Sequence, residues 1–445
     1  MTDLKKTKTK ITNSATSKDL AEVQEHYQDY PYPYRNPEEE RTRLLSIVGE
    51  GLGELNHFLY KGKENFNNGF RCLIAGGGTG DSTIFLAEQL KDKKNAEIIY
   101  LDFSKPSMEV AQKRAEVRGL TNIKWINDSI LNIPNLKLGK FDYINCTGVL
   151  HHLQNPPEGL KNLKDSLTPK GGMGLMVYAK YGRTGVYHIQ EVMKMVNNQV
   201  QSRVEEVMNG KIILDNLPAT NWHKRGWELF SDYQNFGDVG VYDMFLHKQD
   251  RAYSVPELYE FVQNADLNFV DYLDPVEKLL LRPENYIKDF SLLQKIKKMD
   301  KITQQAISEI ITGNIIKHSF YVSNQKDSVA TIDDLDNVPY FYNIANFAKQ
   351  VFDYLEANPV LVNNSVNFTV NNGVLKNVNI SVSVFAYTKY IFKYIAEEKS
   401  LREIFDAIRE ELKQEITNEA LLNEVRNIFT PLFEANILLL KSKKL

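Results

Sequence analysis

The chain of 445 residues has little cysteine and no excess of one charge. Its two cysteines, Cys72 and Cys146, stand in apolar stretches typical of strands, and no CxxC pair occurs, so we expect buried thiols. The 54 basic and 57 acidic residues give a formal net charge of -3. Such a balance provides no strong field for phosphates and argues against nucleic acid as a partner.

Long hydrophobic runs are missing as well. No stretch approaches the roughly 18 apolar residues that indicate a membrane-spanning helix. Residues 1–17 are rich in Lys, Thr and Ser and lack the apolar run of a secretory signal, so we predict a disordered arm there. We therefore expect a cytoplasmic protein without membrane insertion, long enough to form two or three packed units.

An alternation of short apolar runs and helical patterns extends from Arg71 to Val177, as in a parallel sheet with helices on both faces. Helices are predicted at Asp81–Leu90, Pro106–Arg118 and Pro157–Leu167. A further helix is expected at Val255–Ala265. Seven strands are predicted, at Arg71–Ala75, Glu97–Asp102, Asn122–Ile126, Phe141–Cys146, Gly174–Tyr178, Asn268–Tyr272 and His318–Val322. The fold class is therefore α/β, with a Rossmann-like seven-stranded core.

Three further segments surround this core. Residues 18–40 contain a helix-like stretch near Asp19–Tyr27 and then DYPYPYRNP, whose prolines exclude regular structure and indicate an aromatic cover. Residues 180–250 are polar and helical, and we interpret them as an insertion that shapes a substrate pocket. The cover, core and insertion together make a domain over residues 18–325.

A polar, acidic stretch, Ser323–Asn337, is predicted to be a linker to a second domain over residues 335–445. There Asn367–Val384 alternates apolar and polar residues around Asn372-Gly373, which is typical of a hairpin. Ser400–Glu403 forms a capping box that opens one helix, and Asn418–Phe433 predicts another. This small α+β unit resembles winged-helix accessory domains.

The sequence CLIAGGGTGDST joins the first predicted strand to the first predicted helix. Gly76, Gly78 and Gly80 stand where the backbone must approach a ligand closely, although a tight turn alone is the alternative. A dinucleotide-binding loop would carry its third glycine where Asp81 stands. The loop therefore favours a ligand without phosphates.

Two acids follow at the ends of predicted strands. Asp102 closes the second strand, where a carboxylate can accept hydrogen bonds from both hydroxyls of a ribose. Asp128 closes the third strand and is placed to accept from the amino group of an adenine. A loose surface aspartate and a helix cap are the respective alternatives. Together the two acids indicate a nucleoside site at the carboxyl edge of the sheet.

Over Arg71–Val177 the chain resembles class I S-adenosylmethionine-dependent methyltransferases, through AGGGTG, YLDFSKPSMEVA, NDSILNIP and FDYINCTGVLHHLQNP in the family's order. The resemblance implies S-adenosyl-L-methionine as cofactor. In that family the glycine loop holds the methionine part, the first acid the ribose, and the second acid with its neighbour the adenine. The implied cofactor contacts are Gly76, Gly78, Thr79, Gly80, Asp102, Phe103, Asp128, Ser129 and Thr147, with Phe103 packed on the adenine.

One position departs from the family pattern. Methyltransferases of this class often carry an acid two residues before the first loop glycine, and here that residue is Ile74. The contact to the cofactor's amino group is then expected from elsewhere, through a water or through Asp81.

The methyl acceptor is sought at the cover and at the end of the fourth predicted strand. Because the amine of a lysine has a reference pKa of about 10.4, its reactive neutral form needs help at pH 7. Tyr32, flanked by Tyr30 and Tyr34, could pack against an ammonium group or merely clasp the core. His151, next to His152, is placed to face the methyl group or to serve packing. No third ligand is suitably spaced, so we expect no metal there.

Beyond the core, DYPYPYRNPEEE and DMFLHKQDRAYSVPELYEF resemble segments of rickettsial protein-lysine methyltransferases that modify outer membrane protein B. This resemblance implies a protein substrate bearing lysines, such as outer membrane protein B, with Tyr32 and His151 as catalytic candidates. A small-molecule acceptor is the alternative, and a non-catalytic binding module is a third hypothesis. The oligomeric state stays open, with a homodimer among the alternatives.

Overall fold

The computed structural model describes residues 31–200, 202–230, 237–247, 249–359, 364–370 and 378–444. The predicted arm, the helix-like stretch near Asp19–Tyr27, Tyr30 and the Asn372-Gly373 turn lie outside the described residues. Within these ranges no helix is both long and apolar enough to cross a bilayer.

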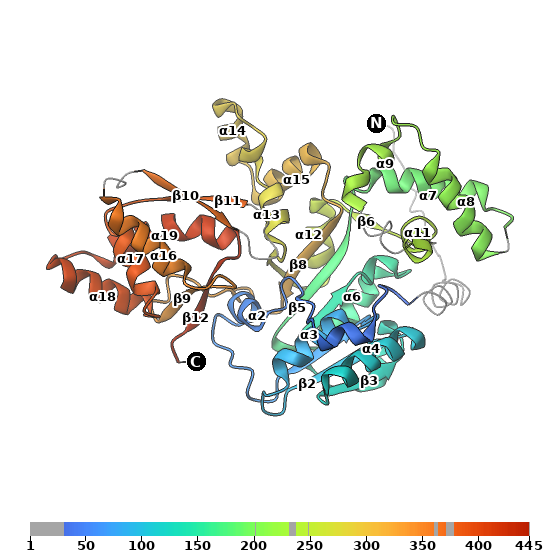
Figure 1. The fold of residues 1–445 in the computed structure, drawn as a ribbon, viewed down its shortest axis with the longest axis horizontal. Coiled ribbons are helices and arrows are strands. Elements are labelled where there is room, and N and C mark those ends of the chain that lie inside the picture. The colour runs from blue at the N-terminus through green and yellow to red at the C-terminus, as the bar shows by residue number, and fades with distance from the viewer. Residues whose placement is uncertain are drawn as a thin grey trace, which may run out of the picture.

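A central sheet forms the core of the molecule, with the strand order β3-β2-β1-β4-β5-β8-β7 (Figure 1). Neighbours from β3 to β5 pair in parallel, whereas β8 runs antiparallel to both β5 and β7. A two-residue strand, β6, pairs with β5 outside this path. The bounds are β1 Arg71–Ala75, β2 Glu97–Asp102, β3 Ile123–Asn127, β4 Phe141–Thr147, β5 Leu167–Ala179, β6 Ala252–Tyr253, β7 Asn268–Tyr272 and β8 Lys317–Ser323. The predicted Rossmann-like seven-stranded core is confirmed, with β6 as an addition.

The fifth predicted strand, Gly174–Tyr178, is too short. In the structure β5 begins at Leu167, because Gly171 and Gly172 let it run close against its neighbours. A Cβ on Gly171 would lie 2.9 Å from the carbonyl oxygen of Phe141, and one on Gly172 would lie 2.7 Å from Leu59. Glycines that mark a turn in the sequence therefore permit strand pairing here.

Helices cover both faces of the sheet, as predicted (Figure 1). One set comes from the amino-terminal part of the chain and comprises η1 Pro37–Arg41, α2 Leu52–Leu59, α3 Asp81–Leu90 and α4 Lys105–Arg118. The other set includes α6 Pro156–Asp165 and α12 Val255–Gln263. Shorter connections are η2 Ile130–Asn132, α5 Ile133–Leu136 and η3 Leu150–His152. Before β8 lie α13 Pro275–Leu280, η5 Pro283–Asn285, α14 Phe290–Lys297 and α15 Lys301–Thr312.

The helical insertion follows β5 and returns to the sheet at β6. It consists of α7 Thr184–Val196, α8 Arg203–Asp215, α9 Trp222–Arg225, η4 Trp227–Phe230 and α11 Gly237–Phe245. These elements share a small core of their own that includes Val186, Met193 and Phe245. The insertion projects from the carboxyl end of β5, at the right of Figure 1.

The C-terminal unit has a separate hydrophobic core and the predicted α+β composition. Its bounds are β9 Asn337–Phe341, α16 Phe347–Ala357, β10 Ser365–Val370, β11 Val378–Ser383, α17 Thr388–Ile395, α18 Leu401–Leu412, α19 Asn418–Glu434 and β12 Leu438–Ser442. The hairpin prediction is confirmed by the antiparallel pairing of β10 and β11, and the capping box by Ser400 and Glu403 at the start of α18. The last strand, β12, pairs antiparallel with β9.

The predicted linker is packed rather than free. Ser328 Oγ donates to the carbonyl of Phe58 at 2.8 Å, and Ala330 N donates to the carbonyl of His57 at 2.7 Å. Leu440 N of β12 donates to His57 Nδ1 at 3.0 Å. The polar groups of this predicted linker find partners on α2, and β12 bonds to the same helix, so the C-terminal unit is fastened to the core.

Candidate active site

The glycine loop lies between β1 and α3. Gly76, Gly78 and Gly80 have φ angles of 82°, 50° and 99°, in the left-handed region that favours glycine. A Cβ on Gly76 would lie 2.2 Å from Val149, and one on Gly80 would lie 2.7 Å from the Cβ of Ala111. Both conformation and space therefore require glycine, and the loop presents bare backbone at the carboxyl edge of the sheet.

Asp102 ends β2 beneath this loop and is 8% exposed. Its Oδ2 accepts from Gly78 N at 2.7 Å, and its Oδ1 accepts from Ser104 N at 2.7 Å. Burial raises the pKa of Asp102, and these two backbone donors partly offset the effect. Because an ionised carboxylate has about four acceptor positions, each oxygen can still accept a hydroxyl of a ribose.

The other predicted nucleoside contacts lie beside Asp102. Asp128 N donates to the carbonyl of Asp102 at 3.0 Å, which brings the ends of β2 and β3 together. The Asp128 carboxylate accepts from Ser129 N at 2.7 Å and from Asn132 Nδ2 at 2.9 Å, while Ser129 Oγ caps η2. Phe103 is half-buried next to Asp102. The N-cap of η2 is therefore Ser129, and Asp128 does not cap this helix.

The two threonines expected at the cofactor have different surroundings. Thr79 is 1% exposed, and its Oγ1 donates to the carbonyl of Pro33 at 2.7 Å, so this hydroxyl fastens the aromatic cover. Thr147 is exposed at the end of β4, and its Oγ1 accepts from Asn145 Nδ2 at 3.0 Å. Thr147 is therefore the more accessible of the two.

The described part of the predicted aromatic cover, residues 31–40, is held on the glycine loop by ion pairs. Arg35 donates to the two carboxylate oxygens of Asp81 at 2.8 and 2.6 Å. Arg114, 1% exposed, donates to Asp81 at 2.7 Å, to the carbonyl of Thr79 at 2.7 Å, and to Glu40 at 2.7 Å. Burial would raise the pKa of Asp81, but Arg35 and Arg114 hold it below its usual value. Asp81, expected as a contact for the cofactor's amino group, is thus already neutralised by guanidinium groups.

His151 lies in η3, directly after β4, and is 1% exposed. Its ring packs on that of Tyr178 with the centroids 3.8 Å apart. Neither ring nitrogen of His151 has a hydrogen-bond partner within the described ranges. Burial lowers the pKa of His151 well below its usual value, and the nearby His152 and Arg183 add to the effect. The structure therefore holds an uncharged imidazole with free nitrogens at the end of β4.

A buried polar cluster from the insertion surrounds His151. The guanidinium of Arg183 lies over the ring of Tyr178 at 3.6 Å and pairs with Asp250 at 3.2 Å. His152 Nδ1 lies 2.9 Å from the carbonyl of Gln249, and its ring stacks on His247 at 3.9 Å. These contacts close the end of the insertion over β4 and β5.

The cover tyrosines differ in position. Tyr34 is 68% exposed, whereas Tyr32 is half-buried. The carbonyl of Tyr32 lies 3.0 Å from where a Cβ on Gly78 would stand. Burial raises the pKa of Tyr178, and the nearby phenol of Tyr32 contributes to the rise. Tyr32 therefore spans from the glycine loop toward the His151 cluster.

Sequence reasoning did not single out Tyr178, Arg183, His247 or Asp250. His247 and Asp250 stand in DMFLHKQDRAYSVPELYEF, whose resemblance to a methyltransferase subgroup was a usable signal. Tyr178 ends the fifth predicted strand, which places it at the functional edge of the sheet. Arg183 carries no comparable signal.

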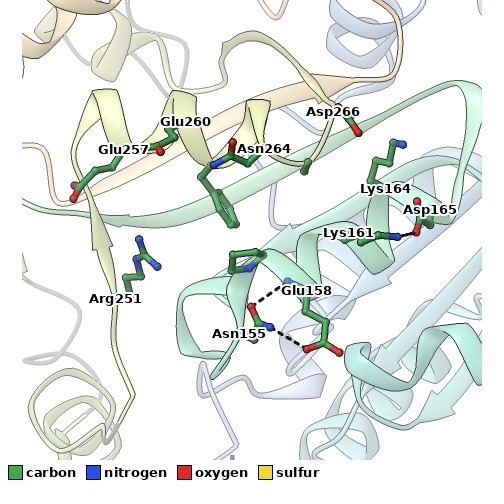
Figure 2. Close-up of a pocket in the computed structure, with 13 residues that line it drawn as sticks. Asn155, Glu158, Lys161, Lys164, Asp165, Arg251, Glu257, Glu260, Asn264 and Asp266 are labelled. Atoms are coloured by element: carbon green, nitrogen blue, oxygen red, sulfur yellow. Dashed lines mark hydrogen bonds and ion pairs between the residues drawn. The ribbon is translucent and has the colours of Figure 1, made fainter. Parts of the chain in front are cut away.

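A groove of about 620 Å³ lies between α6 and α12 and adjoins the site at Arg251, whose N donates to the carbonyl of His151 at 3.1 Å. Figure 2 shows its charged side chains, with Asn155 bonded to Glu158 and Lys161 paired with Asp165. None of the predicted site residues lines it. The groove is not the candidate active site.

The comparisons with known proteins match the part of the chain that contains the glycine loop, Asp102 and Asp128. Residues 73–173 match the sequence model of a methyltransferase domain. An uncharacterised protein of Synechococcus is 34% identical over 206 residues, which cover 46% of this chain and 48% of that protein. A demethylmenaquinone methyltransferase of Geobacillus kaustophilus is 32% identical over 111 residues, or 24% of this chain and 45% of that enzyme. The chain thus spans about half the length of these curated relatives.

Among solved structures, PKMT2 from Rickettsia typhi is similar with a TM-score of 0.57 and 18% sequence identity, over 90% of this chain and 77% of that one. Its complex with AdoHcy gives a TM-score of 0.56 over 93% and 76% of the two chains. At this identity the likeness shows a shared fold, which extends over most of the chain.

Proposed function

Because the chain contains a class I S-adenosylmethionine-dependent methyltransferase domain, with S-adenosyl-L-methionine as its cofactor, we propose that it transfers methyl groups to lysine side chains of a protein substrate. The observation that carries this proposal is the uncharged, buried His151 with two free ring nitrogens at the end of β4. It stands beside the glycine loop and beneath the insertion.

The residues of the donor side fit the cofactor. The glycine loop offers backbone without Cβ atoms, and Asp102 keeps free acceptor positions beneath it. Asp102 would hold the ribose, Asp128 and Ser129 the adenine, and Phe103 would pack on the adenine ring. The bound cofactor supplies a methyl group on a positively charged sulphur, and its transfer is an in-line displacement that requires alignment of the acceptor.

The acceptor side favours a neutral amine. A lysine amine brought against His151 and Tyr178 loses its hydration, and the guanidinium of Arg183 lies 3.6 Å from the Tyr178 ring. Both effects disfavour the ammonium form and lower the pKa of the amine. A neutral imidazole of His151 would accept a hydrogen bond from the amine and leave its lone pair directed at the methyl group. Tyr32 would close the site and exclude water.

A small-molecule acceptor is the second candidate function. It is supported by the similarity to a demethylmenaquinone methyltransferase, whose matched segment corresponds to 24% of this chain. The lysine proposal has the additional support of the insertion and of a fold shared with PKMT2 over 90% of the chain.

The experiment that distinguishes lysine methylation from methylation of a small molecule uses the full chain with methyl-labelled S-adenosyl-L-methionine. The substrate is a lysine-bearing fragment of outer membrane protein B, and the matched control is the same fragment with its lysines replaced by arginine. We expect label on lysine in the first fragment and none in the second. Absence of label from lysine while a small-molecule extract becomes labelled would favour the second candidate.

A further inference from the structure

A buried glutamate without a charge partner lies beside the glycine loop. Glu50 lies two residues before α2 and is 1% exposed. Asn145 Nδ2 donates to its Oε1, and Gln89 Nε2 donates to its backbone carbonyl at 3.1 Å. Its Oε2 has no hydrogen-bond partner in the part of the chain that the structure describes. A buried carboxyl oxygen without a partner calls for a ligand or a proton.

The position of Glu50 relates it to the cofactor site. Asn145, which holds its carboxyl group, also donates to Thr147 Oγ1 at the exposed end of β4. Asn145 is the register partner of Ile74 in the pairing of β1 with β4, so their side chains lie on the same face of the sheet. Ser82, the second residue of α3, is the other polar neighbour of Glu50. The Glu50 carboxyl group therefore lies between β4 and the start of α3, on the face of Ile74.

Ile74 stands at the position, two residues before the first loop glycine, where the class I methyltransferases that this chain resembles often carry an acid. Asp81 does not replace that acid, since Arg35 and Arg114 occupy its carboxylate. Glu50 differs from Asp81 because no described basic side chain pairs with it: its hydrogen-bond partners are the Asn145 amide and the Ser82 hydroxyl, and its charged neighbours are the acids Glu54 and Asp81. Burial raises the pKa of Glu50 to about 8, Ser82 and Asn145 partly offset this, and Glu54 adds to it.

We propose that Glu50 binds the α-ammonium group of S-adenosyl-L-methionine and so replaces, from a different segment of the chain, the acid that is missing at Ile74. This inference rests on the proposed function, because it assumes that the domain binds this cofactor. Glu50 is a binding residue, and its carboxylate positions the methionine part of the cofactor above the glycine loop.

The proposal predicts that Glu50 releases a proton when the cofactor binds, and this release can be measured. In the free protein Glu50 is largely protonated at pH 7, because its pKa is about 8. When an ammonium group docks beside it, the carboxylate form is favoured and the proton leaves to solvent. Binding of a cofactor at pH 7 should therefore release about one proton.

The test is calorimetry of S-adenosyl-L-homocysteine with the full chain at pH 7, in two buffers of different ionisation enthalpy. The difference in heat between the buffers gives the number of protons released. We expect about one proton for the wild type and none for Glu50→Gln, with affinity reduced about tenfold or more in the variant. Glu54→Gln is the matched control, because Glu54 is a buried carboxyl group whose partners are Gly51 and Tyr342. The affinity of Glu54→Gln should match that of the wild type, whereas its proton release should be smaller, because loss of Glu54 lowers the pKa of Glu50.

A second comparison uses only the wild-type protein. The analogue of S-adenosyl-L-homocysteine that lacks the α-amino group should bind about tenfold more weakly or worse and release no proton. This comparison decides the question if Glu50→Gln does not fold. Equal affinity and equal proton release for the two ligands would overturn the inference. Failure of the wild type to bind S-adenosyl-L-homocysteine at all would instead overturn the proposed function.

Discussion

The carboxyl edge of the sheet has two halves that are built differently. Around β1, β2 and β3 the acids already have partners: Asp102 accepts from Gly78 N of the glycine loop, and Asp128 accepts from Ser129 N of its own loop. Around β4 and β5 the central side chain, His151, is buried with both ring nitrogens free. The carboxylates of Asp102 and Asp128 are thus oriented by hydrogen bonds before a ligand arrives, whereas no described residue bonds to the imidazole nitrogens of His151.

This difference follows from how each half is assembled. The donor half consists of three consecutive strand-to-helix connections, and the carboxylates of Asp102 and Asp128 accept hydrogen bonds from residues at most 24 positions away. The acceptor half requires the insertion to fold back, so that Asp250 meets Arg183, 67 residues earlier. The donor half is therefore held by its own strand-to-helix connections, whereas the acceptor half depends on how the insertion packs.

The largest expected effect is on the donor half. Asp102→Ala removes the predicted ribose contact and leaves the buried amides of Gly78 and Ser104 without an acceptor, at about 1–3 kcal/mol for each group. We expect the dissociation constant of S-adenosyl-L-homocysteine to rise about 100-fold, as measured by calorimetry. Asp92→Ala, at an exposed turn after α3, is the control and should bind normally. Unchanged affinity of Asp102→Ala would refute the ribose assignment.

The second-largest expected effect is on catalysis by the acceptor half, without a matching effect on cofactor binding by the donor half. His151→Ala should lower kcat for lysine methylation about 10- to 100-fold, because the amine loses its orienting acceptor. The dissociation constant of the cofactor should change by less than about twofold, since His151 belongs to the acceptor half. Steady-state kinetics and calorimetry measure the two quantities. His188→Ala, on the exposed side of α7, serves as control. A loss of cofactor affinity equal to the loss of kcat would contradict the division into two halves.

Acid should weaken the acceptor half. The pKa of His151 in the folded protein is well below its unfolded value of about 6.5, so its contribution to stability is present above that pH and is lost as the pH falls. Between pH 7 and pH 5 the wild type should lose about 2 kcal/mol more unfolding free energy than His151→Phe, in which nothing titrates at this position. Denaturant unfolding at the two pH values measures this. Equal losses would mean that His151 is not buried as described.

The smallest effect concerns the cover. Arg35 and Asp81 have side chains 24% and 22% exposed, and Arg114 remains beside Asp81 when Arg35 is removed. Arg35→Ala should therefore cost about 1 kcal/mol or less in thermal or denaturant unfolding. Arg41→Ala breaks an exposed pair with Glu38 away from the loop and is the control. A loss above about 3 kcal/mol would show that Arg35 alone fastens the cover.

The sequence predicted the fold correctly where an element is short and apolar and where turn residues or a change of pattern mark both of its ends. β1, β2 and β7 have the predicted bounds, and so does α3, because each begins and ends at a change of pattern. The prediction of β5 was too short because pairing with β4 and β8 overrides the local glycine signal. The linker at Ser323–Asn337 was predicted from composition, but its backbone bonds to α2 depend on a neighbour some 270 residues earlier.

The sequence by itself determined the donor half: the glycine loop, Asp102 and Asp128 each lie within one strand-to-helix connection, where short-range geometry fixes their places. The tertiary structure decided the rest. It showed that Asp81 is neutralised by Arg35 and Arg114, that no described residue bonds to the ring nitrogens of His151, and that Glu50 lies on the face of Ile74. These facts concern burial and charge between distant segments, which no local pattern contains, because a side chain's environment is set by whatever packs against it.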